Sequence, residues 1–176
     1  MLIKKPYLIA EIGINHNGDL DLAKKLIDIA IENKFDAVKF QKRDIETVYS
    51  QEILDTPRQS PWGTTTREQK YGLEFGKAEY DQIDSYCKLN NIAWSASPWD
   101  LDSLQFLDQY DLPYIKMPSA HLTNDELLAA CRDTGKKVIL STGMSTVEEI
   151  EHAVDVLRSN GGCDFALLHC NSTYPA

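Results

Sequence analysis

Two lysines stand inside runs of apolar residues, Lys39 in "AVKF" and Lys116 in "YIKMPS". A single lysine in a strand is most often an edge or surface residue, but two at equivalent places in one parallel sheet would converge on one space. A lysine that is buried without a partner is desolvated and loses its proton. A dianionic ligand such as a phosphate would keep both lysines charged, whereas a lysine with a lowered pKa could form a Schiff base. The residues leave both chemistries open.

A carboxylate, Glu11, interrupts the first apolar run of the chain, "YLIAEI". It can pair with one of the lysines, accept hydrogen bonds from a polyol, or act as a general base. Hydroxyl groups at the ends of later runs offer hydrogen bonds to phosphate or carboxylate oxygens, at Ser97, Ser119 and Thr142. These residue types together indicate a site for a small polar anion.

The four histidines carry weaker signals. His169 ends the run "ALLHC", where a histidine is more often a satisfied core residue than a metal ligand. His16 and His121 fall in expected loops, and His152 falls on the exposed side of an expected helix. No two histidines have the spacing of a metal-binding pair.

The elements that must position these side chains alternate along the chain. Short apolar runs typical of buried strands are followed by amphipathic segments typical of helices. The runs cover residues 7–12, 36–41, 92–97, 113–118, 137–142 and 165–170. The helical segments cover residues 19–34, 77–91, 101–111, 124–135 and 145–162. Six strands alternating with five helices predict a parallel α/β sheet.

Helix start and stop signals support these bounds. Asp19 or Asp21 is a suitable N-cap for the first helix, and Asn124 for the fourth. Ser145 followed by Glu148 matches a capping box for the fifth. Glycines end the last two helices, at 135 and at 161–162. The segment from 44 to 76 is rich in Pro, Thr, Ser and Arg and is expected to be a long loop, which in a compact domain is functional or disordered.

Two α/β architectures compete for this pattern. A doubly wound sheet would carry a glycine-rich turn after its first strand, and "GINHNG" is not that fingerprint. A (β/α)8 barrel collects polar residues at the C-terminal ends of its strands. That is where they occur: Glu11, Lys39 with Gln41, Ser95 with Ser97, Lys116 with Ser119, Ser141 with Thr142, and His169. We therefore predict one domain over residues 1–176, an incomplete (β/α)8 barrel with about six of its strands.

Composition excludes some classes of function. The chain is 43% hydrophobic and carries a net charge of −9, which argues against nucleic-acid binding. No apolar run approaches the roughly 20 residues that span a bilayer. The four cysteines are scattered without a C-x-x-C pair and predict reduced, buried thiols in a cytoplasmic protein.

Six motifs match a known family in order and spacing: "AEIGINHNGDLDLAKKLIDIA", "DAVKFQKR", "SASPWD", "YIKMPSAHLTN", "VILSTGMST" and "LLHCNSTYP". Over residues 7–175 the chain thus resembles the sialic acid synthase family, which makes N-acetylneuraminate, legionaminate and pseudaminate. The resemblance implies condensation of phosphoenolpyruvate with the open-chain aldehyde of an N-acetyl hexosamine, with release of phosphate. It also implies a (β/α)8 barrel followed by a small antifreeze-like domain, in a domain-swapped homodimer.

The resemblance also implies roles for residues. Lys39 and Lys116 would bind phosphoenolpyruvate as cations rather than as Schiff bases, assisted by Ser97, Ser119 and Ser172. The sugar contacts would come from Glu11, Gln41 and Tyr174. The catalytic set would then be Glu11, Lys39 and Lys116. A divalent metal, manganese or magnesium, would polarise the aldehyde.

The chain departs from the family pattern in several places. The family's metal histidines belong to motifs on the last two strands, and those motifs and the antifreeze-like domain are expected beyond Ala176. We therefore expect little synthase activity from these 176 residues alone. Ala120 and His121 replace the Gly and Glu of the family's "PSGE", and Ser172 stands where some members carry Asn.

Two other functions remain open at this stage. One is another phosphoenolpyruvate-dependent aldol-type synthase, of the deoxy-octulosonate phosphate type. It would need extra cations for a sugar phosphate, which Arg58, Arg67 and Lys70 could supply. The other is a non-catalytic remnant that binds an anion.

Overall fold

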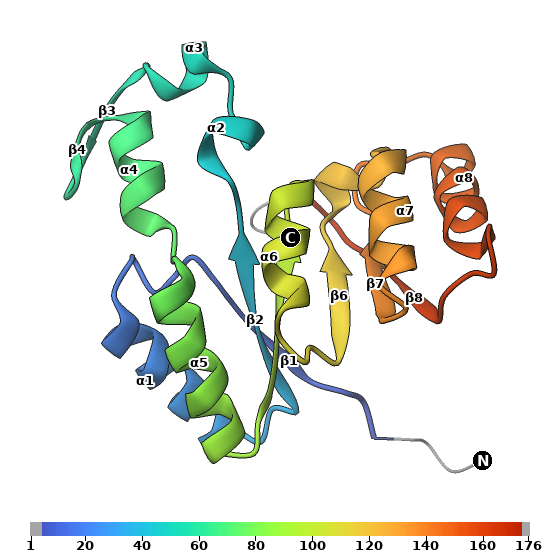
Figure 1. The fold of residues 1–176 in the computed structure, drawn as a ribbon, viewed down its shortest axis with the longest axis horizontal. Coiled ribbons are helices and arrows are strands. Elements are labelled where there is room, and N and C mark those ends of the chain that lie inside the picture. The colour runs from blue at the N-terminus through green and yellow to red at the C-terminus, as the bar shows by residue number, and fades with distance from the viewer. Residues whose placement is uncertain (1–4, 174–176) are drawn as a thin grey trace. The chain divides into compact units, whose positions relative to one another are not determined.

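The structure, a computed structural model, describes residues 5–173 and divides into two compact units. The first comprises residues 5–41 and Tyr49–Ser95, and the second comprises Lys42–Val48 and residues 96–173. Each unit has its own buried core of aliphatic and aromatic side chains. Strands and helices alternate along both units, as the sequence predicts (Figure 1).

The first unit contains β1 (Ile9–Gly13) and most of β2 (Ala37–Lys42). The two strands pair in parallel, and their register sets Glu11 opposite Lys39. They belong to a sheet of order β1-β2-β5, whose third strand, β5 (Ala93–Pro98), runs from the first unit into the second. This register therefore places a carboxylate beside a lysine on neighbouring strands.

Two helices of equal length flank these strands, α1 (Leu20–Glu32) and α5 (Lys77–Leu89). They lie side by side in Figure 1. Each buries one face at helical spacing, as an amphipathic helix must: Ala23, Ile27 and Ala30 on α1, and Tyr80, Ile83 and Cys87 on α5. Of the two predicted N-caps for α1, Asp19 is used, and its side chain accepts a hydrogen bond from the Leu22 amide.

The segment between β2 and α5 differs from the loop expected over residues 44–76. It forms short helices and one antiparallel strand pair: α2 (Ile45–Val48), α3 (Gln51–Leu54), β3 (Pro57–Ser60), β4 (Gly63–Thr65) and α4 (Thr66–Leu73). A reciprocal capping box between Thr65 and Glu68 starts α4. The Trp62 indole covers Gly72 so closely that a Cβ there would lie 2.1 Å from the ring. The loop prediction was wrong because α2, α3, β3 and β4 are only three or four residues long and α4, "TREQKYGL", has few apolar residues to show a hydrophobic period.

The second unit contains a parallel sheet of order β6-β7-β8. Its strands are β6 (Tyr114–Met117), β7 (Lys137–Ser141) and β8 (Phe165–Leu168). Its helices are α6 (Leu101–Asp108), α7 (Asp125–Asp133) and α8 (Val147–Arg158), with a 3-10 turn η1 (Ser119–His121) directly after β6. Helices α7 and α8 pack side by side (Figure 1). All six predicted strands and all five predicted helices are confirmed.

One predicted helix cap is shifted by a residue. The capping box of α8 is formed by Thr146 and Glu149, not by Ser145 and Glu148. Both pairs have the required spacing, so the sequence alone does not separate them. The Ser145 hydroxyl instead donates to the carbonyl of Gly143, 3.3 Å away.

All four cysteines are free thiols, and two of them match the predicted burial. Cys87 and Cys131 are buried, and burial raises the pKa of each thiol to about 12. Cys163 and Cys170 are only partly buried, which corrects the prediction for those two. Within residues 5–173, no helix combines the length and apolar character needed to cross a membrane.

Candidate functional site

The first unit brings Glu11 and Lys39 together at the ends of β1 and β2. Lys39 Nζ lies 2.9 Å from Glu11 Oε2, and it also donates to the carbonyl of Phe40 at 3.3 Å. The lysine is 5% exposed, whereas 55% of the Glu11 side chain is exposed. The predicted possibility that Glu11 partners one of the lysines is therefore realised with Lys39. The open side of the carboxylate remains available to a ligand.

Gln41 joins this pair around Gly13, which adopts a left-handed φ of +54°. A Cβ at this glycine would lie 3.2 Å from Gln41 Nε2 and 3.2 Å from Glu11 Oε1. Both side chains therefore lie against the bare backbone of Gly13. The structure thus groups three predicted site residues in one place: a carboxylate, an ammonium and an amide.

The turn that follows β1 is held by His16, which is 3% exposed. Its ring stacks on Phe75 with centroids 3.9 Å apart, and Nδ1 accepts a hydrogen bond from the Gly18 amide at 3.1 Å. Burial lowers the pKa of His16 to about 4, so the ring is neutral near pH 7. His16 is therefore a packing residue that positions the turn beside Glu11, not a proton donor at neutral pH.

The second unit surrounds Lys116 with hydroxyl and carbonyl oxygens. Lys116 is 9% exposed, and its Nζ donates to Ser141 Oγ at 2.6 Å and to the carbonyl of Met117 at 2.9 Å. Cys170 Sγ lies 3.2 Å from the same hydroxyl. Ser141 ends β7, the strand beside β6, so the parallel pairing of the two strands explains this contact.

Two more serines lie beside Gly143. The amide of Gly143 donates to Ser119 Oγ at 2.9 Å. A Cβ at Gly143 would lie 2.5 Å from Ser172 Oγ and 3.0 Å from Ser119 Oγ, so only a glycine lets both hydroxyls approach. We call Lys116, Ser119, Ser141, Gly143 and Ser172 the serine cradle. An ammonium and several hydroxyls, on strands β6 and β7 and in the segments that follow β6 and β8, suit an anion such as a phosphate or carboxylate.

Two members of the serine cradle were missing from the predicted site. Ser141 is noticed in the sequence only as a strand-end residue, and Gly143 only as part of "STGM". The signal for Ser141 is its place one strand away from Lys116. The role of Gly143 depends on residues 119 and 172, which are distant in sequence, so no local pattern identifies it.

The remaining predicted residues have mixed outcomes. Ser97 is 1% exposed within β5, and Tyr174 lies outside the described residues. The Thr142 hydroxyl donates to the carbonyl of Leu168 at 2.9 Å. His169 is exposed rather than a core residue, and His152 forms an ion pair with Asp125 at 2.8 Å. Lys39 and Lys116 lie in different units, so their expected convergence on one ligand stays a prediction.

The residues of 5–173 do not supply a metal site. No group of three or more His, Cys, Asp or Glu side chains in this part of the chain is arranged to hold an ion. Burial raises the pKa of the Cys87 and Cys131 thiols to about 12, so these two are neutral near pH 7.

The extra cations of the 44–76 segment are engaged locally. Arg67 Nη2 lies 3.0 Å from Asp55 Oδ1 and also bonds to Gln51, and Lys70 Nζ lies 4.6 Å from the centre of the Tyr49 ring. Arg58 is exposed. These contacts tie α4 to α3 and give no cluster of cations for a sugar phosphate.

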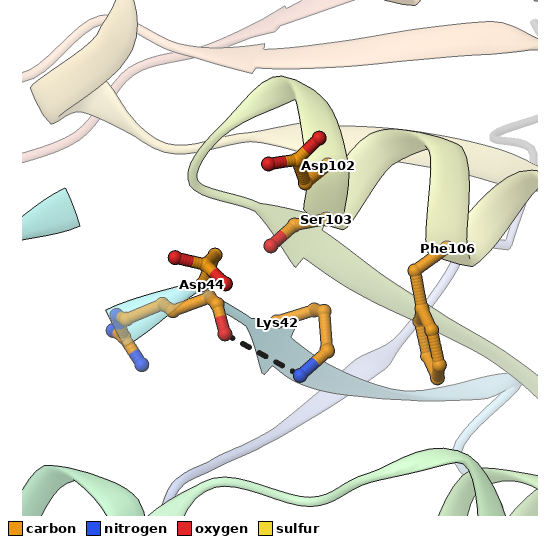
Figure 2. Close-up of a pocket in the computed structure, with 6 residues that line it drawn as sticks. Lys42, Asp44, Asp102, Ser103 and Phe106 are labelled. Atoms are coloured by element: carbon orange, nitrogen blue, oxygen red, sulfur yellow. Dashed lines mark hydrogen bonds between the residues drawn. The ribbon is translucent and has the colours of Figure 1, made fainter. Parts of the chain in front are cut away.

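A small cavity is lined by residues of the second unit alone. It measures about 210 Å³ and is lined by Lys42, Arg43, Asp44, Asp102, Ser103 and Phe106 (Figure 2). Lys42 Nζ donates to the carbonyl of Arg43 at 3.3 Å and lies 5.2 Å from the centre of the Phe106 ring. Two carboxylates balance the two cations, so this cavity lacks the net positive charge of an anion site.

Comparison with known proteins places the chain in a family. The model of the NeuB family matches residues 26–176. N-acetylneuraminate-9-phosphate synthase of Drosophila melanogaster is 39% identical over 99% of this chain and 47% of its own length. N,N'-diacetyllegionaminic acid synthase of Campylobacter jejuni is 40% identical over 99% of this chain and 54% of its own length. The chain thus spans about half the length of these relatives.

Solved structures agree with the predicted fold. The crystal structure of N-acetylneuraminic acid synthetase from Leptospira borgpetersenii, in complex with citrate, matches 97% of this chain and 55% of its own, with a TM-score of 0.83 and 34% identity. DAHP synthase of Thermotoga maritima, at 15% identity and a TM-score of 0.65, shares the fold alone over 92% of this chain and 41% of its own. The predicted incomplete (β/α)8 barrel type is confirmed by these matches, and the chain belongs to the NeuB family.

Proposed function

We propose that this chain is the phosphoenolpyruvate-binding part of a sialic acid synthase-type enzyme. The enzyme would condense phosphoenolpyruvate with the open-chain aldehyde of an N-acetyl hexosamine, giving a nonulosonic acid and phosphate. The observation that carries the proposal is the serine cradle: Ser119 and Ser172 lie beside Gly143, and Lys116 donates to Ser141, two residues before that glycine. Membership of the NeuB family and the names of the relatives support the same reaction.

The proposed roles divide between two substrates. Lys39 and Lys116 hold the anionic groups of phosphoenolpyruvate, with hydroxyls from Ser97, Ser119 and Ser172. Glu11 and Gln41, which share the space beside Gly13, bind hydroxyls of the sugar, and Tyr174 adds a further contact. A half-exposed carboxylate paired with a buried lysine is well suited to accept hydrogen bonds from a polyol.

The chemistry needs positioning and charge more than a nucleophile of the protein. The C3 carbon of phosphoenolpyruvate forms the new C–C bond to the aldehyde carbon of the sugar. Water adds to C2, and the C–O bond to phosphate then breaks, leaving the keto group of the product. Cationic lysines stabilise the charge on the carboxylate and phosphate throughout these steps. The hydroxyls beside Lys116 can orient the anion, and because they are uncharged they leave the positive charge of the lysine in place.

Other parts of this proposal concern the protein beyond the described residues. A divalent metal, manganese or magnesium, would polarise the aldehyde and would be held by residues outside 5–173. The last two barrel strands, the antifreeze-like domain and a homodimer remain predictions for the full-length protein, as does a cytoplasmic location. The relatives include synthases of phosphorylated and unphosphorylated products, so family membership leaves the phosphorylation of the acceptor open.

The test is phosphate release by the protein in its full natural length, with phosphoenolpyruvate, N-acetylmannosamine and manganese. Lys116→Met and Lys39→Met should each weaken phosphoenolpyruvate binding by about 10- to 100-fold in calorimetry, because a charge-assisted hydrogen bond is lost. Lys137→Met is the matched control, since this lysine is exposed at the start of β7 and pairs with Asp164 at 2.9 Å.

Two results would contradict the proposal. Turnover of a sugar phosphate in preference to every N-acetyl sugar would favour the deoxy-octulosonate phosphate type of synthase. Binding of phosphoenolpyruvate without turnover of any acceptor would favour an anion-binding remnant.

A further inference from the structure

The second unit holds a larger cavity, of about 410 Å³, whose lining includes His121, two residues after Ser119 of the serine cradle. We call it the ring cavity. Its lining comes from α2, from the start of α6, and from η1 and the start of α7: Thr47, Val48, Trp99, Asp100, Leu101, Asp102, His121, Asn124 and Glu126. Its volume falls in the range of small-molecule sites, about 300 to 1,000 Å³.

Two rings connect the ring cavity to predicted phosphoenolpyruvate contacts. Trp99 follows Ser97 by two residues, and His121 follows Ser119 by two residues within the turn η1. The rings pack edge to face, with centroids 5.1 Å apart. Each ring therefore follows a proposed phosphoenolpyruvate contact by two residues along the chain, so the ring cavity is formed by the same segments that carry those contacts.

Both rings carry a polar atom whose hydrogen-bonding capacity is unmet. Trp99 Nε1 and His121 Nε2 are buried and have no hydrogen-bond partner among the residues that the structure describes. Leaving such an atom unsatisfied is unfavourable, so native proteins rarely do so without a ligand or water to fill the place. A hydroxyl or amide of a ligand could satisfy an indole N–H and an imidazole nitrogen together.

The other polar groups of the ring cavity are partly committed to the fold. Asp100 accepts hydrogen bonds from the amide and hydroxyl of Ser103 and from the amide of Asp44. Asn124 Oδ1 accepts from the amide of Leu127, as the N-cap of α7. Asp102, Glu126 and Thr47 are exposed side chains on its rim. Polar contacts to a ligand would thus come from the two rings and from this rim.

The charge of the ring cavity is unfavourable for a phosphate. Three of its lining residues are carboxylates, Asp100, Asp102 and Glu126. Burial lowers the pKa of His121, with an opposing effect of Asp100 and a further lowering by Arg43, so the imidazole is neutral near pH 7. The nearby cation, Arg43, stacks on the Trp99 ring at 4.1 Å and is outside the lining. A dianion would therefore meet more negative than positive charge.

We infer that the ring cavity receives an uncharged hydrogen-bonding substituent of the acceptor sugar, such as a hydroxymethyl or acylamino group, and that Trp99 and His121 select it over a sugar phosphate. This inference rests on the proposed function. It makes Trp99 and His121 specificity-determining residues. His121 stands where the family pattern "PSGE" has Glu.

The experiment compares N-acetylmannosamine with its 6-phosphate at saturating phosphoenolpyruvate, using the full-length protein. Wild type should have a kcat/KM at least about tenfold higher for the unphosphorylated sugar. His121→Phe keeps the ring shape and removes its nitrogens, and it should raise the KM for N-acetylmannosamine about tenfold. The KM for phosphoenolpyruvate should stay within about twofold. Trp99→Phe should act in the same direction, and His121→Gln, which retains polar atoms, should recover part of the loss.

The control is His152→Gln, which alters an exposed histidine on α8 and should change neither KM. Thermal melts verify that each variant is folded, and Trp99→Phe keeps the test valid if His121→Phe does not fold. The inference is wrong if wild type prefers the 6-phosphate. It is equally wrong if the folded ring variants leave the acceptor KM unchanged while wild type turns over. If wild type releases no phosphate with any acceptor, the proposed function fails and this inference fails with it.

Discussion

Lys39 in the first unit and Lys116 in the second occupy corresponding places in parallel strands, and both are buried. Lys39 lies 2.9 Å from the carboxylate of Glu11. Lys116 instead donates to the hydroxyl of Ser141 at 2.6 Å and to the carbonyl of Met117 at 2.9 Å. The two lysines therefore differ in a contact at the ammonium group, which meets a carboxylate at Lys39 and a hydroxyl at Lys116.

This difference predicts that the surroundings of the two lysines contact different substrates. A carboxylate beside Lys39 reduces the local positive charge and offers acceptors to sugar hydroxyls. A hydroxyl beside Lys116 can accept from the lysine and donate to an incoming oxygen at once. The serine cradle should therefore dominate the affinity for phosphoenolpyruvate, and the surroundings of Glu11 should dominate contacts to the sugar.

The largest effect is expected from Gly143→Ala. The new Cβ would lie 2.5 Å from Ser172 Oγ and 3.0 Å from Ser119 Oγ. Both atoms are the ends of rotatable side chains, so the hydroxyls can turn away. The third neighbour, the backbone oxygen of Cys170 at 3.3 Å, needs to move only slightly. Affinity for phosphoenolpyruvate should fall about 10- to 100-fold in calorimetry, with a melting temperature close to that of wild type.

Gly76→Ala is the matched control for that substitution. It is also a glycine-to-alanine change, in the first unit, and its Cβ would meet only Glu79 Oε2 at an ordinary 3.4 Å. It should leave the affinity unchanged. If Gly143→Ala binds phosphoenolpyruvate as well as Gly76→Ala does, the serine cradle is not the anion site.

The next effect concerns the pH dependence of stability, because the fold lowers the pKa of His16 in the first unit and raises that of His152 in the second. His16 has a folded-state pKa of about 4, below its unfolded value of about 6.5. The unfolded state therefore binds more protons between these values, and stability falls as the pH falls from about 6.5 to 4. A shift of this size corresponds to about 2 to 3 kcal/mol. His152 has the opposite sign, since its hydrogen bond to Asp125 raises its pKa, and its contribution is lost as the pH rises.

Urea unfolding between pH 4 and 7 measures this response. His16→Asn keeps an acceptor near the Gly18 amide and removes the titrating ring, so it should flatten the pH dependence while lowering stability at pH 7. His152→Gln should retain the steep fall below pH 6.5. An unchanged slope in His16→Asn would mean that other groups cause the acid sensitivity, and that the turn beside Glu11 does not depend on a neutral His16.

The sequence was sufficient for the repeated elements and for part of the site. Buried parallel strands leave continuous apolar runs, so β1, β2, β5, β6, β7 and β8 could be predicted closely. The lysines were recognisable because a charge inside such a run is unusual. The family motifs added Ser172 and Tyr174, and they gave Gln41 its expected role as a sugar contact.

The features that could not be predicted from the sequence depend on contacts that a local sequence pattern does not show. The strand pair β3–β4 forms in a segment whose elements are three or four residues long. Gly143 looks like an ordinary loop glycine until Ser119 and Ser172 are placed beside it. The choice of Thr146 over Ser145 as a cap follows from the Ser145 hydroxyl being bonded to Gly143. The unmet nitrogens of Trp99 and His121 are likewise a property of packing.

The smallest effects should separate the two lysine environments most directly. Glu11→Gln removes the ionised partner of buried Lys39, and Ser141→Ala removes a neutral partner of Lys116. The Glu11 side chain is 55% exposed, so water can replace part of its contribution, and Glu11→Gln should lower the free energy of unfolding by about 1 kcal/mol. Ser141→Ala loses one hydrogen bond to Lys116 and should also lower it by about 1 kcal/mol. Their kinetic effects should differ: Glu11→Gln should raise the KM of the sugar, and Ser141→Ala that of phosphoenolpyruvate. If both variants raised the same KM in equal measure, Glu11 and Ser141 would serve one substrate, and the division between the surroundings of the two lysines would be wrong. A crossed result would show that the carboxylate beside Lys39 serves the sugar and that the hydroxyl beside Lys116 serves phosphoenolpyruvate.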